Sequence, residues 1–241
     1  MLFDKFENRI VYKGVLEAVT PIHIGAGENS IDPGKTDGSV VKNSEGKPYI
    51  PGSSLKGVLR CKLESLLSNE EIAKKWGVWS CNIFGNTCIT KSFVENNKDK
   101  RKNNPEEYAR EIWNKSCHVC RLFGNQHMAS HVQVKDSVLL TGGEEELRNG
   151  VGIDRDTGTA AKGITYDFNV VSAGSTFEFE LVACNIDEDS KKLLNLLISM
   201  LEQGEISIGG KTSRGLGKIV LKNLEISVQT PETLLEQFTK A

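Results

Sequence analysis

Four cysteines in the middle of the chain have the types and spacing of a metal site. Six residues separate Cys81 from Cys88, and two separate Cys117 from Cys120, which is the spacing of a zinc knuckle. Two thiolate pairs brought together supply the four ligands of tetrahedral Zn²⁺, and four protein ligands leave no position for a catalytic water. We therefore predict a structural Zn²⁺ that stabilises a segment with little core of its own.

The spacing leaves two alternatives to this zinc site open. The four thiols could be buried without a metal, and any of three nearby histidines could replace a cysteine as ligand: His118, His127 and His131. The remaining cysteines, Cys61 and Cys184, lie within a predicted helix and at the end of a predicted strand. We expect both to be core residues.

A glycine-rich stretch near the carboxyl end, residues 209–217, has the composition of a phosphate-binding loop. It ends like a nucleotide-binding P-loop, but Glu205 stands where that motif requires its first glycine. Glycines let a backbone approach a phosphodiester closely, and Lys211 and Arg214 add positive charge. The alternative is a hairpin turn with solvated charges.

Two further basic residues, Lys56 and Arg60, lie one helical turn apart at the start of a predicted helix. The free N–H groups at a helix start favour a phosphate. Simple solvation explains these side chains equally well, so the pair by itself is a weak signal.

No Ser-His-Asp or Cys-His pairing of a nucleophile with a base stands out along the chain. His23 follows the first predicted strand, where a histidine is more often structural than a base. Asp32 and Asp37 lie in a glycine-rich segment over residues 25–46, and a loop aspartate is ordinarily a turn former. These residues alone therefore do not predict catalysis.

The periodicity of apolar residues predicts the elements that must position these side chains. Alternation predicts strands over residues 9–20, 132–140, 175–184, 205–208 and 216–228. Helical spacing predicts one helix after Pro51, capped by Ser53 or Ser54, and a second over 189–203. This order is the split βαβ pattern of an α+β, ferredoxin-like domain (βαββαβ), the topology of RNA-recognition modules.

Two insertions interrupt this single domain of residues 1–241. The first, about residues 77–130, contains the four cysteines and a polar tract over 95–104, which we expect to be mobile because it has no apolar side chain to bury. The second, about 141–174, has few residues for a core and predicts a protruding hairpin. Insertions of this size in a compact domain are usually functional.

Composition limits the function classes. The chain has 241 residues, of which 38% are hydrophobic, enough to fill a core. Its net charge of −2 argues against sequence-blind coating of nucleic acid but allows a local basic groove. The most apolar run, residues 193–201, is too short to span a membrane, and the amino-terminal residues lack the apolar core of a secretory signal. We expect a cytoplasmic protein with no membrane partner and with reduced cysteines.

Four motifs, taken together and in this order, resemble the RAMP superfamily of CRISPR-associated proteins. They are residues 21–27 (PIHIGAG), 49–60 (YIPGSSLKGVLR), 117–124 (CHVCRLFG) and 209–217 (GGKTSRGLG). The best match is the repeating backbone subunit of type III effector complexes. The resemblance spans nearly the whole chain, which makes it far more specific than any single motif.

The resemblance implies a ferredoxin-like palm that stacks with copies of itself and with other effector subunits along a guide RNA. It also implies a thumb-like hairpin that flips a nucleotide out of the guide–target duplex, here the segment around Arg155 to Lys162. The guide backbone would be bound, without reading of bases, by these two residues and by Lys56, Arg60, Lys211 and Arg214.

Catalytic members of the family cut the bound target RNA at regular intervals with a loop aspartate and a divalent cation, here taken as Mg²⁺, and leave a cyclic phosphate. The matching position is Asp37, and Asp32 is the second candidate because the loop varies in length within the family. RNA carries its own nucleophile, the 2′-hydroxyl, so positioning, a carboxylate and a metal meet the needs of this chemistry.

Three other functions stay open. The chain could be a scaffold that binds guide RNA without cutting, since several relatives lack the acid. It could process the guide with a histidine such as His23. It could also be a zinc-stabilised RNA-binding module with no CRISPR role.

Overall fold

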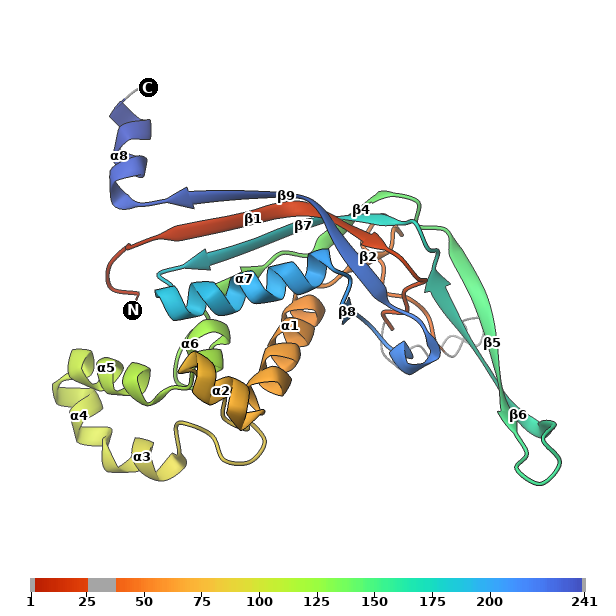
Figure 1. Ribbon diagram of the computed structural model, residues 1–241, viewed down its shortest axis with the longest axis horizontal. Helices are drawn as coiled ribbons and strands as arrows, with labels where there is room; N and C mark the ends of the chain where they lie inside the picture. Colours follow the sequence, from red (N-terminus) through yellow and green to blue (C-terminus); the bar gives the residue numbers. More distant parts are fainter. Residues whose placement is uncertain (1–2, 26–37, 240–241) are drawn as a thin grey trace.

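One antiparallel sheet and one hairpin make up the β structure of the computed structural model, which describes residues 3–25 and 38–239 (Figure 1). The sheet contains β1 (Arg9–Ala18), β2 (Tyr49–Ile50), β3 (Val132–Val134), β4 (Ser137–Thr141), β7 (Thr176–Cys184), β8 (Ile206–Ser207) and β9 (Lys218–Gln229). The hairpin pairs β5 (Glu145–Ile153) with β6 (Ala160–Val171). The helices are α1 (Gly52–Leu67), α2 (Glu70–Trp76), α3 (Lys91–Asn96), α4 (Lys98–Asn103), α5 (Pro105–Lys115), α6 (His118–Phe123), α7 (Glu188–Glu202) and α8 (Pro231–Thr239), and a 3₁₀ turn, η1, covers Thr212–Arg214. None of these helices is long and apolar enough to cross a membrane.

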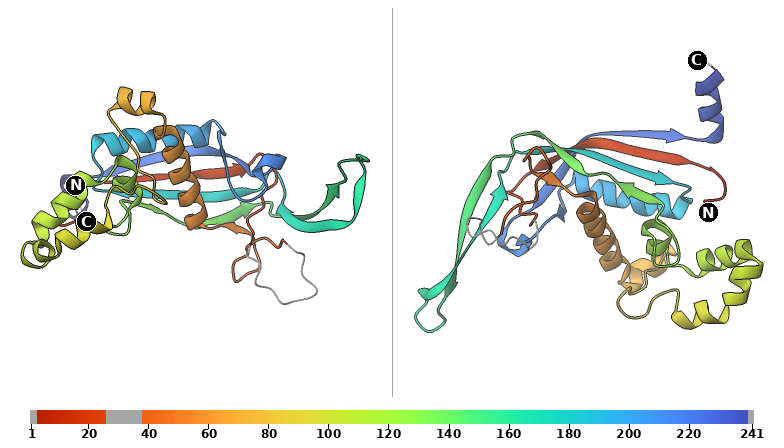
Figure 2. Two further views of the ribbon diagram at one scale, coloured as in Figure 1. Left: turned by 90° about the horizontal axis from the view of Figure 1, so that it is seen from below. Right: turned by 180° about the vertical axis from the view of Figure 1, so that it is seen from behind.

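The strand order brings distant parts of the chain together. The path through the sheet is β2-β4-β7-β1-β9-β8, and β1 pairs antiparallel with both β7 and β9. In the sequence α1 lies between β1 and β4, and α7 lies between β7 and β9; both helices lie on the same face of the sheet (Figures 1 and 2). The predicted mixed α/β class with an antiparallel sheet is confirmed.

The main core lies between the sheet and these two helices, as the periodicity predicts. Tyr12 and Leu16 on β1 belong to one buried cluster with Leu55, Leu59 and Leu63, which recur at every fourth position of α1. Alternation on the strand and the four-residue spacing on the helix place these side chains on the facing surfaces of the two layers. The core thereby fixes where α1 starts relative to the sheet.

The start of α1 shows that the prediction of a serine cap is wrong. Pro51 occupies the cap position and makes no side-chain cap hydrogen bond. The N–H of Gly52 instead donates to Oδ1 of Asp136, at 2.7 Å, from the bend between β3 and β4. A Cβ at Gly52 would lie 2.2 Å from the carbonyl oxygen of Val134, so glycine alone allows this close approach. The capping carboxylate comes from a part of the chain 84 residues away.

The cysteine-containing insertion is mostly helical. Its small apolar cluster consists of Ile89, Tyr108 and Ile112. The polar tract over 95–104 forms the end of α3 and all of α4. Nζ of Lys100 lies 3.0 Å from a carboxylate oxygen of Glu107 and 2.6 Å from one of Glu111. Ion pairs therefore join this tract to α5, and its expected mobility stays a prediction.

The segment between β4 and β7 forms the β5–β6 hairpin. β5 and β6 pair from Glu145↔Val171 outward and extend away from the sheet (Figures 1 and 2). The base of β6 returns to the body of the molecule, where the N–H of Val171 donates to the carbonyl of Ile22 at 2.8 Å. The hairpin is thus joined to the segment that follows β1.

Candidate functional site

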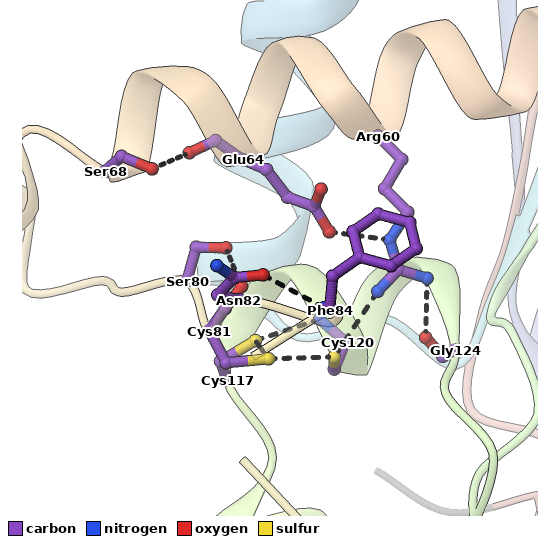
Figure 3. Close-up of polar contacts among 10 residues, drawn as sticks. All are labelled: Arg60, Glu64, Ser68, Ser80, Cys81, Asn82, Phe84, Cys117, Cys120 and Gly124. Carbon is purple, nitrogen blue, oxygen red and sulfur yellow. Dashed lines mark hydrogen bonds and ion pairs between the residues drawn. The ribbon is translucent and has the colours of Figure 1, made fainter. Parts of the chain in front are cut away.

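The four predicted cysteine ligands meet in one cluster. The Sγ atoms of Cys81, Cys88, Cys117 and Cys120 all lie within 4.8 Å of one another. Sγ of Cys81 lies 3.6 Å from that of Cys117 and 3.7 Å from that of Cys120 (Figure 3). A tetrahedral Zn²⁺ with Zn–S bonds of about 2.3 Å places its sulfur ligands about 3.8 Å apart. The cluster therefore fits this geometry and could hold such an ion.

Local structure explains why these cysteines converge. Cys117 is the N-cap of α6, and its Sγ accepts a hydrogen bond from the N–H of Cys120 at 3.3 Å. Trp79 donates its N–H to Nδ1 of His118 and accepts from the N–H of His118, each at 3.1 Å. These two hydrogen bonds join the start of α6 to the segment that carries Cys81.

The pKa values of Cys88 and Cys120 in the cluster are shifted in opposite directions. Hydrogen bonds from Cys117 and Cys120 hold the pKa of the Cys88 thiol far below its usual value. The hydrogen bond with Cys117 raises the pKa of Cys120, and Cys88 and burial raise it further. Deprotonation of the whole cluster therefore needs a cation to compensate the accumulated negative charge.

The histidines that could replace a cysteine lie outside the cluster. Within residues 3–25 and 38–239, the group placed to hold a metal contains the four cysteines alone. His118 accepts a backbone hydrogen bond through Nδ1, and Nδ1 of His131 lies 2.7 Å from the carbonyl oxygen of Cys184.

Cys61 is exposed and Cys184 half-buried. The prediction that both are core residues is wrong for Cys61, which lies outside the buried leucine stripe of α1.

Arg60 lies beside the cysteine cluster. Its Nε donates to Oε1 of Glu64 at 2.8 Å, its Nη1 donates to the carbonyl of Gly124 at 3.0 Å, and its Nη2 lies 3.6 Å from Sγ of Cys120 (Figure 3). Lys56, one turn earlier, is half-buried, and burial followed by the charge of Arg60 lowers its pKa. The two predicted RNA-binding residues of α1 therefore have different surroundings, and their contact with RNA stays a prediction.

The glycine-rich loop packs closely against the segment that follows β1. Gly209 has a φ of 86°, and a Cβ there would lie 2.3 Å from the carbonyl oxygen of His23. The N–H of Gly210 donates to the same carbonyl at 2.8 Å. The loop continues into η1 and returns to β9. Its glycines thus allow a close backbone approach that a simple hairpin turn would not require.

Two cation–aromatic pairs join this loop to the base of the hairpin. Nζ of Lys211 lies 4.5 Å from the centre of the Phe168 ring, and the guanidinium of Arg214 lies 5.4 Å from that of Tyr166. Nη1 of Arg214 also donates to the hydroxyl of Tyr166. Neither aromatic residue is among the predicted site residues, although two aromatic side chains spaced by two on a strand are a usable signal. Phe168 is buried, Tyr166 and Lys211 are half-buried and Arg214 is exposed, so the two aromatic rings lie beneath the positive charges of the loop.

His23 lies beside the end of the first loop. Its Nδ1 is 2.7 Å from the carbonyl oxygen of Asn169, whose N–H donates to the carbonyl of Gly38 at 2.9 Å. A Cβ at Gly38 would lie 3.2 Å from the His23 ring. Asp32 and Asp37 lie outside the described residues. Gly38 is described, and it contacts the hairpin through Asn169 and Phe168.

The two residues predicted for a thumb, Arg155 and Lys162, lie elsewhere on the hairpin. Arg155 is exposed in the turn between β5 and β6, at the end of the hairpin away from the sheet (Figure 1). Asp154 fixes this turn by accepting hydrogen bonds from the N–H groups of Asp156, at 3.0 Å, and Thr157, at 2.9 Å. Lys162 belongs to β6. The structure therefore does not bring Arg155 together with Lys211 and its neighbours.

The chain matches the model of a known family over most of its length. The family model of the RAMP superfamily matches residues 15–220. The chain belongs to the RAMP superfamily. The match includes all four cysteines and the glycine-rich loop of this RAMP protein, and it confirms the resemblance that the four motifs predict.

Two relatives of this RAMP protein, from two organisms, share one name with each other. The chain is 28% identical to the CRISPR system Cms endoribonuclease Csm3 of Methanocaldococcus jannaschii, over 94% of this chain and 84% of the relative. It is 27% identical to the protein of that name from Methanothermobacter thermautotrophicus, over 92% of this chain and 87% of the relative. In each comparison the similarity therefore extends over most of this chain and most of its relative.

Proposed function

We propose that this RAMP protein is the guide-RNA-binding backbone subunit of a type III CRISPR effector complex and cleaves complementary target RNA at regular intervals. The observation that carries the proposal is the similarity, over 94% and 92% of the chain, to two proteins named as CRISPR endoribonucleases. Its partners are a guide RNA, a target RNA, copies of itself and other effector subunits.

In this proposal the sheet with α1 and α7 is the ferredoxin-like palm, and the β5–β6 hairpin is the thumb. The order β4-β7-β1-β9, with a helix before β4 and another before β9, supports the palm. The projection of the hairpin supports the thumb (Figure 2). Leu147 and Ile153 on β5 are exposed apolar side chains of the kind that wedge against an unstacked base.

The guide backbone binds along the glycine-rich loop and the start of α1. Lys211 and Arg214 bring positive charge to a loop whose glycines admit a phosphate closely, and Lys56 adds a third cation. Arg155 and Lys162 contribute from the thumb. Because phosphate contacts carry no sequence information, such a subunit accepts any guide, and its near-neutral total charge leaves surface for protein partners.

The cleavage step uses the target's own nucleophile. The 2′-hydroxyl loses its proton and its oxygen attacks the adjacent phosphorus. The bond from phosphorus to the 5′-oxygen breaks and that oxygen takes a proton from water, so the products are a 2′,3′-cyclic phosphate and a 5′-hydroxyl. Asp37 either accepts the proton of the 2′-hydroxyl or binds the divalent cation, and Asp32 is the second candidate for this role. When bound, Mg²⁺ would stabilise the charge that develops on the phosphate oxygens. Gly38, which follows Asp37 in the sequence, lies against Phe168 and the His23 ring.

The four cysteines hold a structural Zn²⁺ in this proposal. The separations of 3.6 and 3.7 Å between sulfur atoms support a tetrahedral ion. Four thiolates complete the coordination sphere, so this ion would take no part in cleavage. Its role would be to hold the loop of Cys81 and Cys88 against α6.

Guide processing by His23 is less favoured by the geometry. The side chain is buried, and its Nδ1 lies within hydrogen-bond distance of the Asn169 carbonyl. A carbonyl contact of this kind fixes the orientation of the ring, which is the usual role of a structural histidine. The scaffold function without cleavage differs from the proposal only in the fate of the target RNA.

A target-RNA cleavage assay tests the proposal. Wild type, Asp37→Ala and Asp32→Ala are each assembled with guide RNA and partner subunits, with Mg²⁺ or with EDTA. We expect regularly spaced products from wild type and Asp32→Ala in Mg²⁺ only, and none from Asp37→Ala in an intact complex. Intact target with assembled wild type would make the chain a scaffold, and unchanged cleavage by Asp37→Ala would exclude that residue.

A further inference from the structure

We propose that Arg60 is a positioning residue of the cysteine centre, whose N–H donation to Sγ of Cys120 tightens the binding of a divalent cation there. The inference rests on the structural metal site proposed above. It assigns to Arg60 a role toward the cysteines in place of the RNA contact that its position near the start of α1 predicts.

Three separate contacts orient the guanidinium. Nε is held by Glu64, one turn further along α1, and Nη1 is held by the carbonyl of Gly124, which follows α6. With these two directions fixed, Nη2 lies 3.6 Å from Sγ of Cys120 (Figure 3). The Arg60 side chain is only 19% exposed, so water competes weakly for these N–H groups.

The charge of the centre explains why such a donor matters. Four thiolates and one divalent cation sum to −2, and the permanent positive charge of arginine lies next to one of the sulfur atoms. An N–H donated to a coordinated sulfur offsets part of this charge and holds the ligand in place. The neighbouring sulfur also has an N–H donor: Sγ of Cys117 accepts a hydrogen bond from the N–H of Cys120. The N–H of Arg60 and the N–H of Cys120 therefore serve two adjacent sulfur atoms of the cluster.

Lysine cannot reproduce this arrangement. Arginine presents its donors in a planar fork, whereas a lysine ammonium is a point charge on a flexible stem. Arg60→Lys therefore keeps the charge and loses the simultaneous contacts to Glu64, Gly124 and Cys120. Arg60→Gln loses both the charge and the fork.

A nearby lysine provides the matched control. Lys91 lines the same cleft of about 940 Å³ as Arg60 and Cys120, but it is an exposed residue at the start of α3. Lys91→Gln removes one positive charge from the cleft without removing a donor that holds a sulfur atom. An effect of the overall charge of the cleft on metal binding would therefore also be seen in Lys91→Gln.

The test is zinc release from the full chain to a chromophoric chelator. We expect Arg60→Gln to lower zinc affinity about tenfold, Arg60→Lys to restore part of it, and Lys91→Gln to match wild type. In the Co²⁺-loaded chain, the thiolate-to-metal charge-transfer band of Arg60→Gln should move to longer wavelength, because the sulfur lone pairs lose a stabilising hydrogen bond. This band does not report on general destabilisation, so it separates the proposed role from a merely structural one.

Two outcomes would overturn the inference. Equal zinc affinity and equal Co²⁺ spectra for wild type and Arg60→Gln would do so while leaving the metal site intact. Loss of guide-RNA binding in Arg60→Gln with unchanged zinc affinity would assign the residue to RNA. A third result would contradict the proposed metal site itself: the wild-type chain binds no Zn²⁺. This result can be told apart from the first two because it is seen without any variant.

Discussion

Nζ of Lys211 lies 4.5 Å from the centre of the Phe168 ring. The lysine belongs to the glycine-rich loop and the phenylalanine to β6, so this contact joins the loop to the base of the projecting hairpin. Phe168 also packs edge-on against His23, with ring centres 5.4 Å apart. One aromatic ring thereby contacts both His23 and the loop proposed to bind the guide.

Phe168→Leu should weaken binding of the guide RNA. The leucine keeps an apolar side chain in this buried position but cannot hold the Lys211 ammonium over a ring, so we expect a loss of about two- to fivefold in affinity. Filter binding at fixed salt measures the change. The control is Phe93→Leu, which removes another cation–aromatic contact, at 5.0 Å from Lys115, in the cysteine-containing insertion. Equal losses in both variants would show that Phe168 has no specific effect.

Cys117→Ser should release the metal and unfold the insertion around it. The wild-type chain is expected to contain about one equivalent of Zn²⁺, held by four sulfur ligands. With one ligand lost, the loop of Cys81 and Cys88 no longer has a bridge to α6, so limited proteolysis should cut within residues 77–130. Cys61→Ser, at an exposed position of α1, should retain both zinc and protease resistance. Metal-free wild-type protein purified without a chelator would contradict this prediction.

Asp136→Ala should destabilise the domain by about 1 kcal/mol, the usual cost of removing a helix cap. The carboxylate accepts from the N–H of Gly52 and offsets the positive end of α1. Urea unfolding of the two proteins measures the difference in free energy. Ser53→Ala should leave the free energy of unfolding unchanged, because Ser53 is not the capping residue. The reverse result would restore the serine cap that the sequence predicts.

The stability of the fold should fall as the pH falls below about 6.5, the ordinary pKa of histidine. Burial lowers the pKa of His131, and the hydrogen bond with the Cys184 carbonyl offsets only part of this decrease. The unfolded chain therefore binds a proton at a pH where folded His131 does not, and each such proton favours unfolding. His131→Phe should reduce this slope, because phenylalanine keeps the stacking with Phe3 and has no proton to bind.

The comparison uses His127→Phe, at an exposed position, as its control. Both variants are unfolded by urea at pH 7.5 and 5.5 with the same zinc loading, since thiolate ligands also take up protons on acidification. A steeper loss of stability in His127→Phe than in His131→Phe is the expected result. Identical slopes would mean that His131 does not control the pH dependence.

Several features of this protein were determined by local sequence. Alternation of apolar residues predicts β1 and β7, and four-residue spacing predicts α1 and α7, because these patterns depend only on the geometry of a single element. The cysteine spacing predicts which four residues form the cluster. The order of four motifs predicts the family, which the match over residues 15–220 confirms.

Only the tertiary structure decided which groups meet across the chain. Arg60 and Lys211 are both basic residues near a predicted phosphate site, yet one contacts a cysteine and the other an aromatic ring. The cap of α1 comes from Asp136, and no local pattern predicts a partner 84 residues away. Strand and helix preferences act over a few residues, whereas the partners of a side chain depend on how the sheet, the insertion and the hairpin pack.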